Sequence, residues 1–257
     1  MKAIILAAGL GTRLGEYTQN KPKCMLEFLG KPLIEWQIEK FRRFGIEDIV
    51  IIKGHFGEKI NLPDIKFVEW SGPETNMVID FFEARREFFD DVILSYGDIL
   101  FEDYVLKKVV ESDAEVGVVV DEGWKDYWVE RYGNWLDDSE SMILKVDDII
   151  SLGKSNPLPD EMHARYIGLI KFSKSVFPSV MELYDKSMVE YWDKPWYNAP
   201  SFKKAYMTDF IQALIDESVN VKAIKINKGW LEFDTKKDYE LSLDWVKNET
   251  LNRFFNL

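Results

Sequence analysis

Apolar runs that end at glycine alternate with amphipathic segments near the start of the chain. The run KAIILAA (2–8) is followed by Gly9, and a second run, 48–53, also ends at a glycine. Between them, residues 33–44 place apolar side chains at helical spacing and stop at Gly45. Continuous apolar runs are typical of strands that are buried on both faces of a parallel sheet. The pattern therefore predicts a strand–helix–strand unit.

The same alternation continues along the chain and indicates the fold class. We expect further strands at 65–69, 92–96, 115–121, 142–146, 166–172 and 221–226, and further helices at 76–89, 103–112, 174–186, 203–217 and 235–249. Alternating strands and helices favour an α/β fold with an open, mostly parallel, Rossmann-like sheet flanked by helices. No linker, repeat or low-complexity tract is visible, so we expect one domain over residues 1–257, with an aromatic-rich lobe in its second half.

Composition narrows the possible partners. The 257 residues carry a formal charge of -12, which disfavours a nucleic-acid partner because such binding depends on basic side chains. No apolar run reaches bilayer length and no secretory signal opens the chain, so we expect a cytoplasmic protein without a membrane partner. Cys24 is the only cysteine, and His55 and His163 are the only histidines. Any metal is therefore expected on carboxylates.

A glycine-rich loop follows the first strand. In AAGLGTRL (7–14) the two glycines let the backbone approach a ligand closely, and Arg13 can bind a phosphate in bidentate fashion. Downstream, Lys21 and Lys23 flank the stiff Pro22. This combination predicts phosphate binding, while a tight turn with a solvated arginine remains the alternative.

Two familiar glycine motifs do not fit this loop. A Walker loop is excluded because no Gly-Lys-Ser or Gly-Lys-Thr follows the glycines. A dinucleotide-binding turn needs a third glycine where this chain has Leu14, and the loop to Lys23 is long and interrupted by proline. A dinucleotide-dependent oxidoreductase therefore stays a weaker alternative.

The segment LAAGLGTRLGEYTQNKPKCM (6–25) resembles the signature LAAGxGTRLxxxTxxxPKxM of the nucleoside-triphosphate transferases that make activated sugars and alcohols. Every fixed position of that signature matches. Similar segments continue along the chain as GH (54–55), ETNM (74–77), YGDIL (96–100), YIGLIKFS (166–173) and GWLEFDT (229–235). The resemblance implies a nucleotidyltransferase with a nucleotide-binding half at about 1–120 and an acceptor-binding half at about 121–257.

The resemblance also implies roles for particular residues. Asp98 and Asp234 are expected to hold a Mg²⁺ ion, although Asp98 alone equally fits a helix cap. Arg13 and Lys23 are expected to be catalytic, neutralising charge on the pyrophosphate and the α-phosphate. The expected nucleotide-binding residues are Leu6, Ala7, Ala8, Gly9, Gly11, Thr12, Gly54, Thr75, Asn76 and Gly97.

Similarities to particular branches of this family indicate the expected nucleotide base and the expected acceptor. Members that use dTTP or UTP commonly carry a glutamine and a glycine ahead of the metal aspartate, where this chain has SGPETNM (71–77). The segment is similar to the choline-phosphate and phosphoglutamine cytidylyltransferase branch, so CTP is the expected nucleotide and a small phosphorylated molecule the acceptor. The expected acceptor-binding residues are Trp128, Arg131, Lys154, Tyr166, Gly168, Trp196 and Asp209.

Several alternatives remain open at this point. The aromatic residues at 124–135 and 191–206 suit the quaternary ammonium of phosphocholine or ordinary packing, whereas Lys125, Asp126 and Arg131 suit a zwitterionic acceptor such as phosphoglutamine, which we favour. The expected reaction is attack by an acceptor oxygen on the α-phosphorus, with pyrophosphate leaving. A sugar-1-phosphate uridylyl- or thymidylyltransferase and a non-catalytic nucleotide-binding relative are the competing functions.

Overall fold

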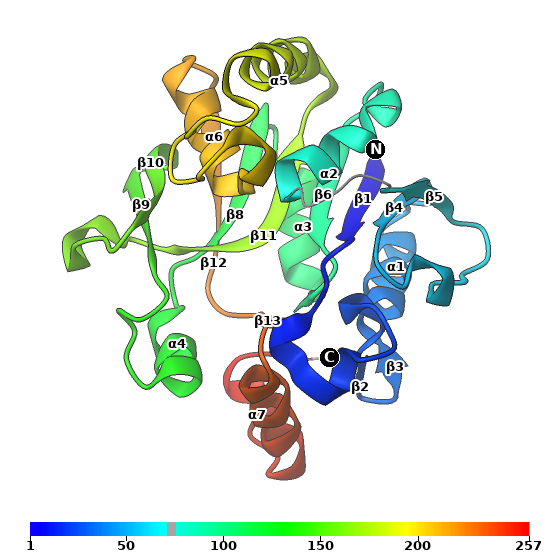
Figure 1. Cartoon of the computed structure of the whole chain (residues 1–257). Helices are drawn as coiled ribbons and strands as arrows, with labels where there is room; N and C mark the ends of the chain where they lie inside the picture. Colours follow the sequence, from blue (N-terminus) through cyan, green and yellow to red (C-terminus); the bar gives the residue numbers. More distant parts are fainter. Residues whose placement is uncertain (71–75, 257) are drawn as a thin grey trace.

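The computed structural model describes residues 1–70 and 76–256, and its centre is a nine-stranded sheet (Figure 1). The strands follow the order β5-β4-β1-β6-β11-β8-β12-β10-β9. Their bounds are β1 (Lys2–Ala7), β4 (Ile49–Lys53), β5 (Lys66–Glu69), β6 (Val92–Tyr96), β8 (Val116–Asp121), β9 (Glu140–Lys145), β10 (Asp148–Ser155), β11 (Arg165–Phe172) and β12 (Val221–Ile226). The sheet therefore contains strands from both halves of the chain.

Most strands of this sheet point the same way. The run β5-β4-β1-β6 is parallel throughout, and β8 and β12 are parallel to each other. β11 lies antiparallel between β6 and β8, and β10 lies antiparallel between β12 and β9. Two of the nine strands, β10 and β11, thus oppose the other seven. The mostly parallel α/β fold expected from the sequence is confirmed.

Helices cover both faces of the sheet (Figure 1). They are α1 (Leu33–Arg43), α2 (Met77–Glu83), α3 (Asp103–Glu111), α4 (Lys125–Tyr132), α5 (Phe177–Tyr191), α6 (Met207–Asp216) and α7 (Lys236–Lys247). Residues of α1, α3, α4 and α7 pack in one core cluster, and residues of α2, α5 and α6 pack in the other. Along β1, Ala3 and Ile5 join the first cluster and Ile4 and Leu6 the second, which explains why its apolar run is continuous.

Two small strand pairs lie outside the main sheet. β2 (Glu27–Phe28) pairs with β3 (Lys31–Pro32), and β7 (Ile99–Phe101) pairs antiparallel with β13 (Trp230–Glu232). Beyond the second pair, the amide of Phe233 donates a hydrogen bond to the carbonyl oxygen of Asp98 at 3.0 Å. This pairing brings the segment after β6 next to the segment after β13.

The structure corrects several expected elements. The helix expected over 76–89 ends at Glu83, and a short 3-10 turn follows where the buried Glu87 forms ion pairs with Lys2 and Lys66. The helix expected over 203–217 begins only at Met207. The sequence reasoning missed β7 and β10 as well as α4, whose aromatic side chains obscure its helical period.

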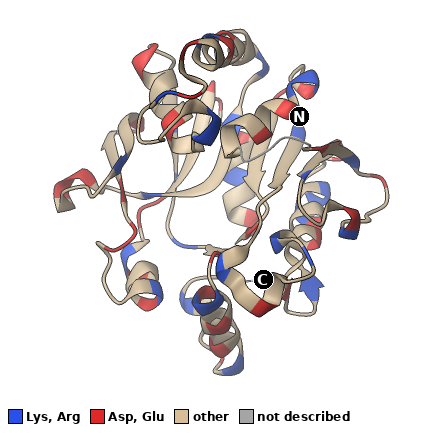
Figure 2. Cartoon of the chain, viewed as in Figure 1, with Lys and Arg blue, Asp and Glu red and all other residues tan. Residues whose placement is uncertain are grey.

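Charged side chains are spread over the outside of the fold. Basic and acidic residues are interspersed along the outer helices in this view rather than collected into one basic face (Figure 2). Within the described residues, no helix has the length and apolar character needed to cross a membrane. The concentration of charge that matters for chemistry lies in a cavity instead.

Candidate active site

A cavity of about 950 Å³ opens at the carboxyl ends of β1 and β6. In open α/β sheets, ligands commonly bind at this edge, where the strands end and the loops begin. The cavity wall combines the loop after β1 with residues of β9, β10 and β11 from the second half of the chain. The wall of this one cavity is therefore built from both halves of the chain.

The loop after β1 packs against the segment that carries Lys23. Gly11 has a φ of +65°, and a Cβ there would lie 3.2 Å from the Cβ of Lys23 and 3.2 Å from Thr18. The Thr18 hydroxyl donates a hydrogen bond of 2.8 Å to the Gly11 carbonyl oxygen. Glycine is therefore required both by the left-handed backbone conformation and by the close approach of the two segments.

Asp98 lies in a tight connection between β6 and β7. Gln37 of α1 is buried and donates hydrogen bonds of 2.8 Å from Nε2 to the carbonyl oxygens of Tyr96 and Ile99. The Ser95 hydroxyl donates to Oε1 of Gln37, also at 2.8 Å. Because these bonds fix the backbone on both sides of Asp98, its carboxylate is held in place before any ligand arrives.

Gly97, beside Asp98, leaves no room for a side chain. A Cβ at this position would lie 2.7 Å from the carbonyl oxygen of Leu6, which accepts a hydrogen bond of 2.9 Å from the Gly97 amide. We expect Gly97→Ala to lower the free energy of unfolding by about 1–3 kcal/mol, the usual cost of overpacking a tight site. Denaturant unfolding monitored by circular dichroism measures this.

Gly9→Ala is the matched control for that measurement. A Cβ on Gly9 would meet no heavy atom within 4 Å, so the free energy of unfolding should stay close to that of the wild type. Equal stabilities for the two variants would show that the contact between Gly97 and Leu6 does not constrain the fold.

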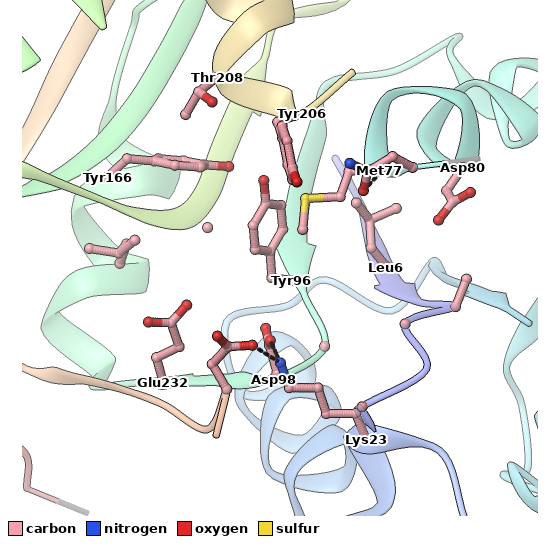
Figure 3. Close-up of a pocket in the computed structure, with 18 of the residues that line it drawn as sticks. Leu6, Lys23, Met77, Asp80, Tyr96, Asp98, Tyr166, Tyr206, Thr208 and Glu232 are labelled. Carbon is pink, nitrogen blue, oxygen red and sulfur yellow. Dashed lines mark hydrogen bonds and ion pairs between the residues drawn. The ribbon is translucent and has the colours of Figure 1, made fainter. Parts of the chain in front are cut away.

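Lys23 lies between the two predicted metal-binding carboxylates. Its Nζ is 2.5 Å from Oδ2 of Asp98 and 2.7 Å from Oδ1 of Asp234. Arg13 Nη1 is 2.7 Å from the other oxygen of Asp234. Figure 3 shows Lys23 reaching towards Asp98 from the loop side of the cavity. All four residues line the cavity, so two cations and two carboxylates form one cluster.

The electrostatics of this cluster keep Lys23 charged. Burial alone would lower the pKa of Lys23, but the charges of Asp98 and Asp234 outweigh it and raise the pKa to about 12. Burial raises the pKa of Asp234, an effect that Lys23 opposes and the nearby Glu232 reinforces. The Arg13 side chain remains 66% exposed, so its guanidinium is accessible to an anionic ligand.

The two aspartates fit a hard divalent cation that is shared with a ligand. Among the described residues, no group of three or more His, Cys, Asp or Glu side chains is gathered for a metal. Mg²⁺ is usually held by one or two carboxylates and completes its shell with phosphate oxygens and water. Two carboxylates beside the glycine-rich loop match that requirement, provided that a ligand supplies the remaining oxygens.

The predicted nucleotide-binding residues that the structure describes all line the cavity. They are Leu6, Ala7, Ala8, Gly9, Gly11, Thr12, Gly54, Asn76 and Gly97. Asn76 also caps α2, because its side chain accepts a hydrogen bond of 2.9 Å from the amide of Met77. Thr75 lies outside the described residues.

Only two of the predicted acceptor-binding residues line the cavity, namely Tyr166 and Gly168. Both belong to β11, and Gly168 has a φ of +86° where a Cβ would collide with the ring of Tyr96. The rings of Tyr96 and Tyr166 are 5.7 Å apart at their centroids in an edge-to-face arrangement. Glycine at 168 therefore allows these two tyrosines to share the wall.

Trp128 and Arg131 are not in the cavity wall, which corrects the expectation of direct acceptor contact. The Trp128 side chain is fully buried in the core, and its Nε1 donates a hydrogen bond of 2.9 Å to the Asp137 carbonyl oxygen. Arg131 is also buried, with its guanidinium bound by Glu232 and by both carboxylate oxygens of Asp238. Both side chains contact residues of the wall rather than the cavity itself, because Trp128 packs against Arg165 and Arg131 binds Glu232.

The structure also places the remaining three predicted acceptor residues away from the wall. Lys154 is exposed and pairs with Glu161 at 2.9 Å, although its neighbours on β10 line the cavity. Trp196 packs in the core. Asp209 caps α6, because its carboxylate accepts a hydrogen bond of 2.9 Å from the amide of Tyr206.

Several residues that line the cavity were not expected from the sequence. They are Glu140, Arg165, Tyr206, Thr208 and Glu232. Glu232 is the last residue of β13 and stands two positions before Asp234, so the alternation of an extended segment was a usable signal for it. For Glu140 and Arg165 no local motif existed, because strands from distant parts of the sequence bring them to the cavity.

The fold is Rossmann-like, and a cluster of cations and carboxylates lies beside a glycine loop. These features are typical of a nucleotidyltransferase, an enzyme that binds phosphate groups and neutralises their charge with fixed cations. The chain belongs to the family of MobA-like NTP transferase domains, whose pattern it matches over residues 3–190.

Individual relatives cover almost the whole chain. It is 36% identical to a CTP:phosphoglutamine cytidylyltransferase of Campylobacter jejuni, with 95% of this chain and 100% of the relative covered. It is 29% identical to a choline-phosphate cytidylyltransferase of Streptococcus pneumoniae, with 97% of this chain and 100% of the relative covered. The solved structure of a CTP:phosphocholine cytidylyltransferase from Streptococcus pneumoniae shares the fold, with a TM-score of 0.72 and 21% identity. The match covers 96% of this chain and 98% of the solved chain.

Proposed function

We propose that this chain transfers CMP from CTP to a small phosphorylated acceptor and releases pyrophosphate. The observation that carries the proposal is the position of Lys23, held by Asp98 and Asp234 beside the glycine loop, in a cavity that continues into the second half of the chain. The names of the two cytidylyltransferase relatives support CTP as the nucleotide and a phosphorylated amino acid or alcohol as the acceptor.

The cations would stabilise the negative charge that moves during the reaction. Lys23 stays protonated at neutral pH because its pKa is raised to about 12, so it can neutralise the α-phosphate. The exposed guanidinium of Arg13 can bind the departing pyrophosphate in bidentate fashion. Both charges are already held in position, so little reorganisation is needed when the charge develops.

Asp98 and Asp234 are the residues that would hold Mg²⁺. The ion would supply further charge neutralisation on the phosphate oxygens of the nucleotide. The aspartates themselves keep Lys23 oriented towards the cavity through their two short ion pairs. Their second role is thus to position the ammonium group.

The acceptor oxygen needs no strong base to attack. The second pKa of a phosphate monoester lies near 6, so its oxygen is already largely ionised at neutral pH. The reaction forms a bond between this oxygen and the α-phosphorus and breaks the bond to the pyrophosphate oxygen. The task of the protein is therefore to hold the two phosphates in line and to neutralise their repulsion.

CTP is expected to be a better substrate than UTP by roughly tenfold to a hundredfold in kcat/KM. Cytosine presents an amino group, a hydrogen-bond donor, where uracil presents a carbonyl oxygen. A backbone carbonyl oxygen in the cavity wall, such as that of Ala8, can accept a hydrogen bond from cytosine but not from uracil. With uracil, two carbonyl oxygens would face each other without a hydrogen bond in a desolvated site, at a cost of about 1–3 kcal/mol.

The specificity constants of CTP, UTP, dTTP and ATP should be measured with one acceptor under matched Mg²⁺. A tenfold preference for UTP or dTTP would exclude the cytidylyltransferase assignment and favour a sugar-1-phosphate uridylyl- or thymidylyltransferase.

A further inference from the structure

The acceptor side of the cavity contains a half-buried carboxylate that forms no ion pair with any of the described residues. Glu140, at the start of β9, lines the cavity. Within the described residues, no lysine or arginine nitrogen lies within 4 Å of its carboxylate. Burial raises the pKa of Glu140, an effect that Arg165 and the Thr208 hydroxyl oppose and that Asp209 and Asp138 reinforce. A carboxylate that is partly buried without an ion pair is stabilised when a ligand places a cation beside it.

The two arginines nearby are occupied by other groups. Arg131 is bound by Glu232 and Asp238. The Arg165 guanidinium lies 3.9 Å from the centre of the Trp128 ring and donates a hydrogen bond of 3.0 Å to the Asp138 carbonyl oxygen. Neither arginine forms an ion pair with Glu140. The acceptor side therefore has an excess of negative charge, although its ligand must carry an anionic phosphate.

A second, independent feature of the same wall points to a hydrogen-bonding ligand. The Tyr166 hydroxyl is buried next to the Tyr96 hydroxyl, and among the described residues it forms no hydrogen bond of good geometry. Figure 3 shows this hydroxyl directed into the cavity, with Thr208 and Tyr206 on the same side. Because a buried hydroxyl without a partner costs free energy, a ligand group that bonds to it would be favoured.

We propose that the acceptor carries a primary ammonium group, which binds Glu140 and donates a hydrogen bond to the Tyr166 hydroxyl oxygen. This inference rests on the proposed function and names the class of its acceptor. A primary ammonium has three N–H donors for a carboxylate and a hydroxyl. A trimethylammonium has no N–H donor and cannot bond to the carboxylate and the hydroxyl in this way, although Tyr96, Tyr166 and Tyr206 in the wall offer it aromatic faces, so phosphocholine is the competing acceptor in the test.

The test compares acceptors that differ in one group. Pyrophosphate release is measured with CTP, Mg²⁺ and either phosphoethanolamine, phosphocholine, 2-hydroxyethyl phosphate, phosphoglutamine or glucose 1-phosphate. We expect the primary ammonium compounds to give the highest kcat/KM, with phosphoethanolamine exceeding both phosphocholine and 2-hydroxyethyl phosphate by at least about tenfold, the scale of a charged hydrogen bond in a desolvated site.

Glu140→Gln and Tyr166→Phe test the residues themselves. Glu140→Gln should raise KM for the best ammonium acceptor by at least about tenfold, leave KM for CTP unchanged and remove most of the preference over 2-hydroxyethyl phosphate. Tyr166→Phe keeps the ring and should raise the same KM by a smaller factor. Glu182→Gln, which changes an exposed carboxylate of α5 outside the cavity wall, is the matched control and should match the wild type.

The outcomes separate this inference from the proposed function. If the wild type is active but prefers phosphocholine or an uncharged acceptor, or if Glu140→Gln keeps the wild-type preference, the ammonium assignment is wrong and the nucleotidyl transfer stands. If no acceptor yields pyrophosphate with any nucleotide, both are wrong.

Discussion

Replacing Asp98 or Asp234 by asparagine is expected to reduce Mg²⁺-dependent turnover to background, a loss of about a thousandfold or more. Each change removes a hard carboxylate ligand at nearly constant volume, and a metal ion contributes several kcal/mol of charge stabilisation to such reactions. In either variant Lys23 keeps one carboxylate partner, so the fold should be preserved. Pyrophosphate release at saturating CTP and acceptor, over a range of Mg²⁺ concentrations, measures the effect.

Asp148→Asn is the control for this pair. Asp148 forms an ion pair of 2.6 Å with Lys222 on the surface, and its loss should leave turnover unchanged. Circular dichroism and the melting temperature establish that all three variants are folded. Near-wild-type turnover in Asp98→Asn or Asp234→Asn would refute the metal assignment.

Arg13→Ala is expected to lower kcat by at least about a hundredfold, which corresponds to about 2.7 kcal/mol of lost transition-state stabilisation. The guanidinium is largely exposed and pairs only with Asp234 among the described residues, so its removal should scarcely affect stability. Arg13→Lys should recover part of the rate, because it restores a charge without the bidentate geometry. Steady-state kinetics in CTP, with acceptor saturating, give kcat and KM separately.

A change confined to KM would mean that Arg13 binds the ground-state nucleotide and takes no part in the transition state. The same experiment at Lys23 would be harder to interpret. Lys23 is largely buried between Asp98 and Asp234, so its removal would leave two carboxylates without their shared cation and would lower stability as well as activity.

The parts of the fold that depend on local pattern were predictable from the sequence. β1 and β4 are buried on both faces, so their apolar runs are continuous and end where the glycines begin. The part of the site around the glycine loop was predictable for a similar reason, since Gly11 and Lys23 lie in one short stretch of sequence and pack against each other.

The parts that depend on long-range pairing were not predictable in the same way. The sequence offers Asp98 and Asp234 as separate strand ends, and only the antiparallel pairing of β7 with β13 brings them to one ammonium group. β7 itself has three residues, which is too short for a period to be recognised. The resemblance to known transferases, rather than the pattern of residues, suggested that the two aspartates act together.

The acceptor side of the cavity shows most clearly that composition does not predict where a side chain lies. Tryptophans are abundant in the second half of the chain, but Trp128 and Trp196 fill the core, and tyrosines line the cavity. An aromatic side chain serves equally well in either place, so its presence in a segment does not reveal which way it points. Glu140 was overlooked because a single glutamate at the start of a strand is ordinary in sequence and unusual only once its place in the cavity wall is known.

The most direct test of the proposed reaction is a product analysis of the wild-type protein incubated with CTP, Mg²⁺ and a phosphorylated acceptor. We expect equal amounts of pyrophosphate and of a new CMP–acceptor conjugate, detected by mass spectrometry, with neither formed when the acceptor or the Mg²⁺ is omitted. Formation of CDP and inorganic phosphate, release of pyrophosphate without a conjugate, or no consumption of any nucleoside triphosphate would contradict it.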